Sequence, residues 1–206
     1  MGRVDYVLAT NAANQIHGII AAALVRPGYT DLAGDTSDGV KGGGFGDNYT
    51  PEVLNQMDAA VRQLKRQLHP SAVVLVGHSG GAAISADLIA RDNGLAKAAL
   101  LLSCPCDVPV WRKHMNTLHP NPLWDKPVTS ISPVDAVSEI SSQTKIWLIV
   151  GDKDDTAPPD FTERYAAALR KRGIKPRVTI LPGEGHIILY DSAVIQQLSA
   201  LVAQLR

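Results

Sequence analysis

The sequence has few cysteines, few aromatic residues and no excess of charge of either sign. Of its 206 residues, 20 are Lys or Arg and 20 are Asp or Glu, and the basic residues form no run. This balance argues against a protein that binds nucleic acid or an anionic membrane surface through charge. The longest apolar stretches, such as residues 19–25, are far too short to cross a bilayer. Apolar types still make up 45% of the chain, which is enough for one domain with a substantial core.

The two cysteines, Cys104 and Cys106, are separated by a single proline and therefore cannot join distant parts of the fold. The first six residues lack the hydrophobic centre of a secretion signal. We therefore expect a cytoplasmic protein.

Short apolar runs alternate with longer helical patterns, which is typical of an α/β fold with a mostly parallel sheet and helices on both faces. The runs show no polar alternation, as expected for strands that are buried on both sides. Strands are expected at residues 18–25, 72–76, 96–103, 145–150 and 177–181, and helices at 51–68, 80–91, 161–171 and from 191 to the C-terminus.

Two segments interrupt this alternation. Residues 35–48 are rich in glycine and are expected to form a loop. Residues 104–142, after the strand that ends near Ser103, are rich in proline and too long for a plain connection. We expect them to form an insertion, similar to a cap, over a site within one domain that spans residues 1–206.

A nucleophile motif follows the second expected strand. Gly77-His78-Ser79-Gly80-Gly81 matches G-x-S-x-G in the context of strand, sharp turn and helix that the motif requires. Such a turn lifts the serine hydroxyl clear of the sheet, and the Gly80 amide at the helix start favours a developing oxyanion. The alternative is a tight turn with a surface serine, and in either case His78 is expected to be a packed residue.

A serine hydroxyl needs a neighbouring base, and that base is oriented by a carboxylate. Candidates for both follow later strands, at the sheet edge where Ser79 is also expected. His186 follows the last strand after a Gly-Glu-Gly sequence, and Asp154 follows the strand at 145–150. Asp152 and Asp155 compete with Asp154 for the role of the acid.

Together these motifs resemble the α/β-hydrolase fold, and in particular the catalytic domains of the prolyl-oligopeptidase and dienelactone-hydrolase types. The resemblance covers essentially the whole chain. It implies a serine hydrolase without metal or cofactor, in which Ser79 is the nucleophile, His186 the base, and Asp154 the acid because of its offsets from Gly151 and Pro158. Two further sequences add to it: Arg26-Pro27-Gly28-Tyr29-Thr30-Asp31 and Ser132-Pro133-Val134-Asp135.

The pattern departs from this family near the N-terminus. The family has a strand before the one expected at 18–25, and that strand ends in a His-Gly pair. If residues 4–9 were this strand, only residues 10–18 would remain for a parallel crossover, which is too short. We therefore expect residues 3–15 to be the helix after a strand that this sequence lacks, which would expose a central edge of the sheet. His17-Gly18 has the sequence of this His-Gly pair, but it precedes an expected strand instead of following one. We therefore interpret the likeness to the family's pair as coincidence.

Several other patterns contain residue types that occur in binding sites. Tyr29, Trp111 and Trp124 either line a substrate pocket or form the core of the insertion, and the sequence leaves both open. Cys104, Cys106, His114 and His119 are zinc-type residues without zinc spacing. The run at 152–163 lacks the glycine of a calcium loop, and the glycines at 39–46 lack the strand and helix of a phosphate loop.

The sequence thus predicts a serine hydrolase that cleaves a small to medium carboxylic ester, thioester or amide. An esterase is favoured over a peptidase because this sequence contains no separate propeller or gating domain, although exopeptidase activity stays open. The alternative is a non-catalytic or shortened member of the fold that serves as a binding or scaffold module. No nucleic-acid or membrane partner is expected, and nothing indicates an oligomeric state.

Overall fold

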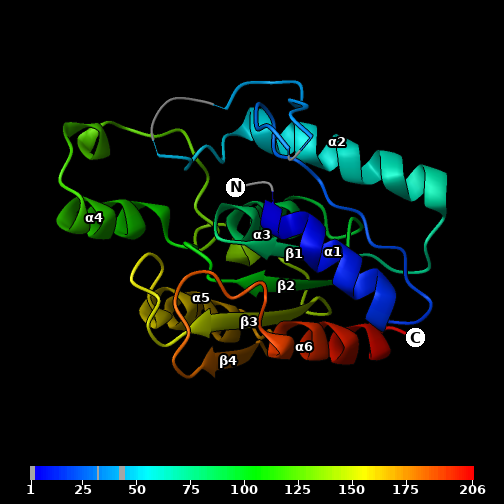
Figure 1. Ribbon diagram of the computed structural model, residues 1–206. Helices are drawn as coiled ribbons and strands as arrows, with labels where there is room; N and C mark the ends of the chain where they lie inside the picture. Colours follow the sequence, from blue (N-terminus) through cyan, green and yellow to red (C-terminus); the bar gives the residue numbers. More distant parts are fainter. Residues whose placement is uncertain (1–2, 32, 42–44) are drawn as a thin grey trace.

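The computed structural model describes residues 3–31, 33–41 and 45–206, so the glycine-rich run at 39–46 lies partly outside the described residues. Its centre is a sheet of four parallel strands in the order β1-β2-β3-β4, with helices on both faces (Figure 1). The strands are β1 (Val74–His78), β2 (Ala98–Leu102), β3 (Lys145–Gly151) and β4 (Arg177–Leu181). The helices are α1 (Arg3–Gln15), α2 (Pro51–Leu68), α3 (Gly80–Arg91), α4 (Val108–Leu118), α5 (Pro159–Lys171) and α6 (Ser192–Ala203), with 3₁₀ turns η1 (Pro122–Asp125) and η2 (Val137–Glu139).

The core is built around β2, whose five residues are all buried. Ala98, Leu100 and Leu102 belong to a cluster with α1 and α6, whereas Ala99 and Leu101 belong to a cluster with α2, α3 and α5. Successive side chains of a strand point to opposite faces, so a continuous apolar run fills both clusters. The expected helix-covered parallel sheet is confirmed.

The helix ends follow local signals in the sequence. The Thr50 hydroxyl accepts a hydrogen bond from the Val53 amide, and Pro51 occupies the first turn of α2. Asp191 caps α6 in the same way, through the Ala193 amide. Helix α1 occupies residues 3–15 as expected. None of the helices in the described part of the chain is long and apolar enough to span a membrane.

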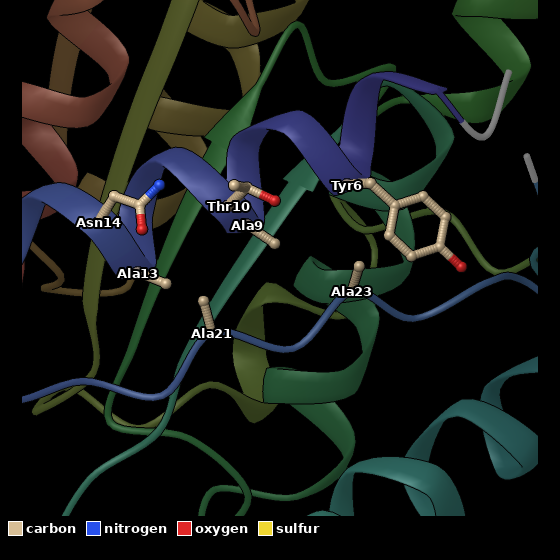
Figure 2. Close-up of a pocket in the computed structure, with 7 residues that line it drawn as sticks. All are labelled: Tyr6, Ala9, Thr10, Ala13, Asn14, Ala21 and Ala23. Carbon is tan, nitrogen blue, oxygen red and sulfur yellow. The ribbon is translucent and has the colours of Figure 1, made fainter.

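The prediction of a strand at residues 18–25 is wrong. Gly18 lies in a turn and residues 19–25 belong to no helix or strand, and among the described residues they form no backbone hydrogen bonds with a neighbouring strand. An open groove of about 400 Å³ lies between this segment and α1, lined on one side by Ala9 and Ala13 and on the other by Ala21 and Ala23 (Figure 2). A segment becomes a strand only when its backbone is hydrogen-bonded to a neighbouring strand. Residues 18–25 have no such neighbour among the described residues, and β1 is therefore an edge strand of the sheet.

The segment 104–142 contains α4 and both 3₁₀ turns. Cys104 and Cys106 form a disulfide with each other. The buried Arg112 pairs with the buried Asp47 and also donates to the carbonyls of Leu123, Trp124 and Lys126. A buried guanidinium is tolerated only when it is paired and hydrogen-bonded, so this cluster ties the segment to the loop before α2.

Helix α3 contains a buried carboxyl group, that of Asp87, with no hydrogen-bond partner among the described residues. Asp87 is fully buried, and neither of its Oδ atoms has a hydrogen-bond partner in the part of the chain that the structure describes. The hydroxyl of Tyr165 on α5 is buried and unpartnered in the same way. Burial raises the pKa of Asp87 to about 8, against a smaller opposing effect of Arg91.

This raised pKa predicts that Asp87 lowers stability as the pH increases. The folded protein holds the proton up to about pH 8, whereas the unfolded chain releases it near pH 4, so the free energy of unfolding should fall by about 1.4 kcal/mol per pH unit between these values. Asp87→Asn should remove this part of the slope, measured by urea unfolding at pH 5, 6, 7 and 8. Asp38→Asn, which changes an exposed loop carboxylate, is the control. Equal slopes for the wild type and Asp87→Asn would contradict the prediction.

Candidate active site

Ser79 lies in the sharp turn between β1 and α3. Its φ of 53° and ψ of −121° are unusual for a residue other than glycine and cost roughly 1–3 kcal/mol. The turn is held because the Ser79 amide donates to the Leu102 carbonyl of β2 at 2.8 Å. Gly77 is required beneath it, since a Cβ there would lie 2.2 Å from the Gly81 carbonyl oxygen. Strand and helix therefore approach closely and present the Ser79 hydroxyl.

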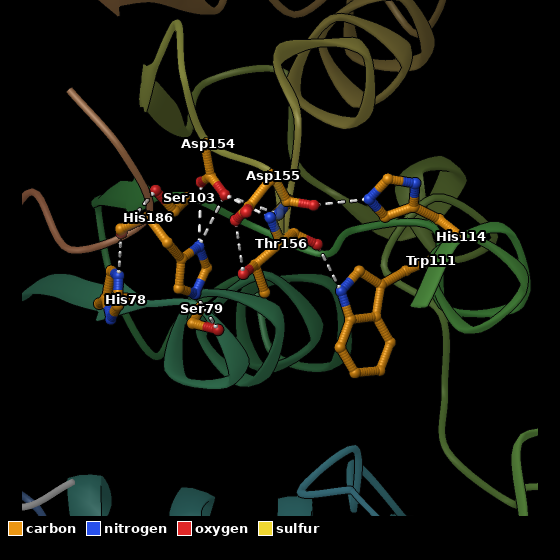
Figure 3. Close-up of polar contacts among 10 residues, drawn as sticks. His78, Ser79, Ser103, Trp111, His114, Asp154, Asp155, Thr156 and His186 are labelled. Atoms are coloured by element: carbon orange, nitrogen blue, oxygen red, sulfur yellow. Dashed lines mark hydrogen bonds and ion pairs between the residues drawn. The ribbon is translucent and has the colours of Figure 1, made fainter. Parts of the chain in front are cut away.

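His186 lies in the loop after β4, and its imidazole reaches the serine. Its Nε2 is 3.0 Å from Ser79 Oγ, and its Nδ1 is 2.9 Å from Asp154 Oδ2 (Figure 3). These distances allow a proton to pass between Oγ and Nε2 while the other ring nitrogen donates to the carboxylate.

Asp154 is the carboxylate that the fold brings to this histidine. It is buried at the end of β3, and its Oδ1 also accepts hydrogen bonds from the amides of Thr156 (3.0 Å) and Ala157 (2.7 Å). Burial by itself would raise the pKa of Asp154, but the hydrogen bonds from His186 and the Ala157 amide outweigh it and hold the pKa below its usual range.

The neighbouring candidates for the acid point elsewhere. Asp152 accepts from the Gly183 amide, and the exposed carboxylate of Asp155 accepts from the Thr156 hydroxyl. Neither carboxylate has a contact with His186 among the described residues. Asp154 therefore has the geometry of the acid, and its two competitors do not.

The Gly80 amide is the first of helix α3, and it has no hydrogen-bond partner within the described ranges. The helix terminus places partial positive charge here. A Cβ on Gly80 would lie 2.7 Å from Arg26 Nη1 and 2.9 Å from the Tyr49 hydroxyl, so these two side chains occupy the space beside the residue.

Two contacts to His186 were missed by the sequence analysis. His78 Nε2 lies 2.8 Å from the main-chain carbonyl oxygen of His186, and Ser103 Oγ lies 3.2 Å from the same oxygen (Figure 3). Burial lowers the pKa of His78 to about 4, so its ring is neutral at physiological pH. Nothing in the local sequence indicates these long-range contacts, because they join residues more than 80 positions apart.

Helix α4 supports the acid loop. The His114 Nε2 lies 2.6 Å from the Asp155 carbonyl, and the Trp111 indole donates to the Thr156 carbonyl at 2.9 Å. The two carbonyls belong to the residues one and two positions after Asp154, so the segment 104–142 packs against the site through its helix (Figure 3).

The three aromatic residues suggested as pocket lining lie in different surroundings. Trp111 and Trp124 are buried in a small cluster with Phe161, and the Trp124 indole donates to the His119 carbonyl. Tyr29 is half-buried, with the cations of Arg26 and Lys41 over its ring. A role for these residues in substrate binding stays a prediction.

Within the described ranges, no group of three or more His, Cys, Asp or Glu side chains has the arrangement of a metal site. The thiols considered for zinc are bonded to each other.

Comparison with known proteins connects this site to a family. Residues 42–205 match the prolyl oligopeptidase family. The chain is 27% identical over 139 residues to kynurenine formamidase of Drosophila melanogaster, covering 61% of this chain and 46% of that protein. It is also 27% identical over 151 residues to a probable chloroplastic glutamyl endopeptidase of Oryza sativa subsp. japonica, covering 68% of this chain and 15% of that protein. The chain thus spans less than half the length of these curated relatives.

Solved structures have the same fold at low sequence identity. Esterase PE8 is similar with a TM-score of 0.56 and 24% identity, over 75% of this chain and 61% of that one. A puromycin-hydrolyzing peptidase of Mycobacterium tuberculosis is similar with a TM-score of 0.59 and 21% identity, over 74% of this chain and 25% of that one. Since the family match covers most of the sequence and these neighbours share its architecture, the chain belongs to the prolyl oligopeptidase family and has the α/β-hydrolase fold.

Proposed function

We propose that this chain is a serine hydrolase that cleaves a carboxylic ester, thioester or amide through an acyl-enzyme on Ser79. The observation on which the proposal rests is the continuous chain of hydrogen bonds from Ser79 through His186 to Asp154. The three residues come from the ends of three different strands, and Ser79 is held in a strained turn that exposes its hydroxyl.

The first half of the reaction forms the acyl-enzyme. His186 Nε2 takes the proton of Ser79 Oγ while the oxygen attacks the substrate carbonyl. Asp154 stays ionised, holds the proton on Nδ1 and stabilises the imidazolium that forms. The Gly80 amide donates to the oxyanion of the tetrahedral intermediate. The imidazolium then protonates the leaving alcohol, thiol or amine, and the acyl group stays on Ser79.

The second half reverses these roles. A water molecule gives a proton to His186 Nε2 and attacks the acyl-enzyme, and the collapse of the second intermediate returns the proton to Ser79 and releases the carboxylic acid. Relatives named as an esterase, a formamidase and peptidases support hydrolysis at a carbonyl carbon. We favour a small to medium ester as substrate, with an exopeptidase as the next choice.

A fluorophosphonate probe tests the nucleophile directly. The probe should label the folded wild type on the peptide that contains Ser79, and Ser79→Ala should abolish both labelling and hydrolysis of p-nitrophenyl acetate. Ser138→Ala, which changes an exposed serine in η2, should label normally. A folded wild type that is neither labelled nor active would favour the non-catalytic alternative, and parallel assays with amino-acyl amides separate esterase from peptidase.

Replacing one carboxylate at a time by its amide tests whether Asp154 is the acid that orients His186. Asp154→Asn should lower kcat by about 10³–10⁴, because the amide no longer holds the His186 proton on Nδ1. Asp155→Asn should stay within a fewfold of the wild type, since the Asp155 side chain has no contact with His186. Steady-state kinetics on the same ester gives both values. Equal losses in the two variants would contradict the assignment of Asp154.

Two adjacent glycines provide a matched test of the oxyanion donor. A methyl group on Gly80 would collide with Arg26 and the buried Tyr49, and the shift should displace the Gly80 amide. Gly80→Ala should therefore lower kcat by about 10²-fold, the effect of losing an oxyanion donor. Gly81→Ala has nothing within 4 Å of its new methyl group and should change kcat little. Circular dichroism checks that both variants fold, and equal kcat values in the two variants would contradict the predicted displacement of the Gly80 amide.

A further inference from the structure

We propose that His78, the residue before the nucleophile, is a positioning residue for the base: it donates a hydrogen bond to the main-chain carbonyl of His186 and thereby holds the His186 imidazole against Ser79. This inference rests on the proposed function and concerns the same site. It assigns a role to a side chain for which the sequence alone predicts only packing.

The strand order explains why the base needs such an anchor. His186 follows β4, whereas Ser79 follows β1 at the opposite edge of the sheet. With a strand spacing of about 4.8 Å, the loop must cross roughly 14 Å to bring the imidazole to the serine. The loop at 182–191 has no helix or strand of its own, so its path depends on bonds to the strand ends that it crosses.

The loop has bonds at each of these strand ends. Near β3, the Lys153 amide donates to the Glu184 carbonyl at 2.9 Å, and the Gly183 amide donates to Asp152. At the end of β2, the Ser103 hydroxyl donates to the His186 carbonyl. At the end of β1, His78 donates to the same oxygen at 2.8 Å. The His78 bond therefore ties the base directly to the strand that presents the nucleophile.

The chemistry of this contact defines the state of His78. A carbonyl oxygen only accepts hydrogen bonds, so Nε2 of His78 must carry the proton. The two imidazole rings lie with their centres 4.9 Å apart and tilted by 49°. Burial lowers the pKa of His78, and the smaller opposing effect of the hydrogen bond to the His186 carbonyl does not cancel it. A neutral ring can donate this bond without placing a positive charge beside the imidazolium that forms during the reaction.

The bond acts on orientation and not on substrate binding. His78 contacts the main chain of His186 and does not touch the oxyanion donor or the reacting hydroxyl among the described contacts. When the anchor is lost, the carbonyl can move and the imidazole tilts with it. Misplacement of a catalytic group by about 1 Å can lower the rate about 10²-fold. The effect should therefore fall on kcat and leave KM nearly unchanged.

Three substitutions separate the hydrogen bond from packing. His78→Phe keeps a ring and removes the donor. His78→Gln places an amide nitrogen near the position of Nε2, whereas His78→Asn has the same amide on a shorter side chain that does not reach the carbonyl. We expect kcat for p-nitrophenyl acetate to fall about 10- to 100-fold in the Phe and Asn variants, with KM within about threefold. The Gln variant should recover to within about fivefold of the wild type.

The outcomes are distinguishable from a failure of the proposed function. If the wild type neither reacts with the fluorophosphonate nor hydrolyses esters, the proposed function fails and His78 has no base to position. If the wild type is active and the Phe and Asn variants keep their kcat, or lose activity only through KM, the positioning role is overturned. Urea unfolding monitors folding, and if His78→Phe does not fold, the comparison of Gln with Asn decides: equal kcat values in these two variants would overturn the inference.

Discussion

The hydrogen bond between His186 and Ser79 depends on the parallel arrangement of the four strands. Because all four run in the same direction, their carboxyl ends meet at one edge, and the residues that follow them can approach one another. β1 is followed by Ser79, β2 by Ser103, β3 by the acid loop and β4 by the loop of His186. The 3.0 Å contact between the serine and the imidazole is thus a property of the whole sheet.

The strained turn at Ser79 is held by the packing on either side of it. The Leu102 carbonyl fixes the Ser79 amide, and ten of the twelve residues of α3 are buried beneath the sheet. The close approach at Gly77 locks strand and helix together. A conformation that costs a few kcal/mol is maintained when its surroundings allow no other.

Two buried carboxyl groups show how partners decide the charge of a side chain. Asp154 and Asp87 are both removed from solvent. Asp154 accepts bonds from His186 and from two amides, and its pKa is lowered, whereas Asp87 has no described partner and its pKa is raised to about 8. Burial raises the pKa of both groups, and the hydrogen bonds to Asp154 reverse the direction for that group alone. One group is therefore suited to hold an imidazolium, and the other is neutral over much of the physiological range.

The sequence by itself determined the elements with strong local signals. The capped helix at 51–68, four of the five expected strands and the elbow around Ser79 follow from apolar patterning, capping residues and glycine spacing, which act over a few neighbouring residues. Only the tertiary structure decided that residues 18–25 pair with no strand, because pairing depends on a partner far away in the chain. It also separated Asp154 from its two neighbours and brought His78 and Ser103 to the His186 carbonyl, since both depend on the paths of loops across the sheet.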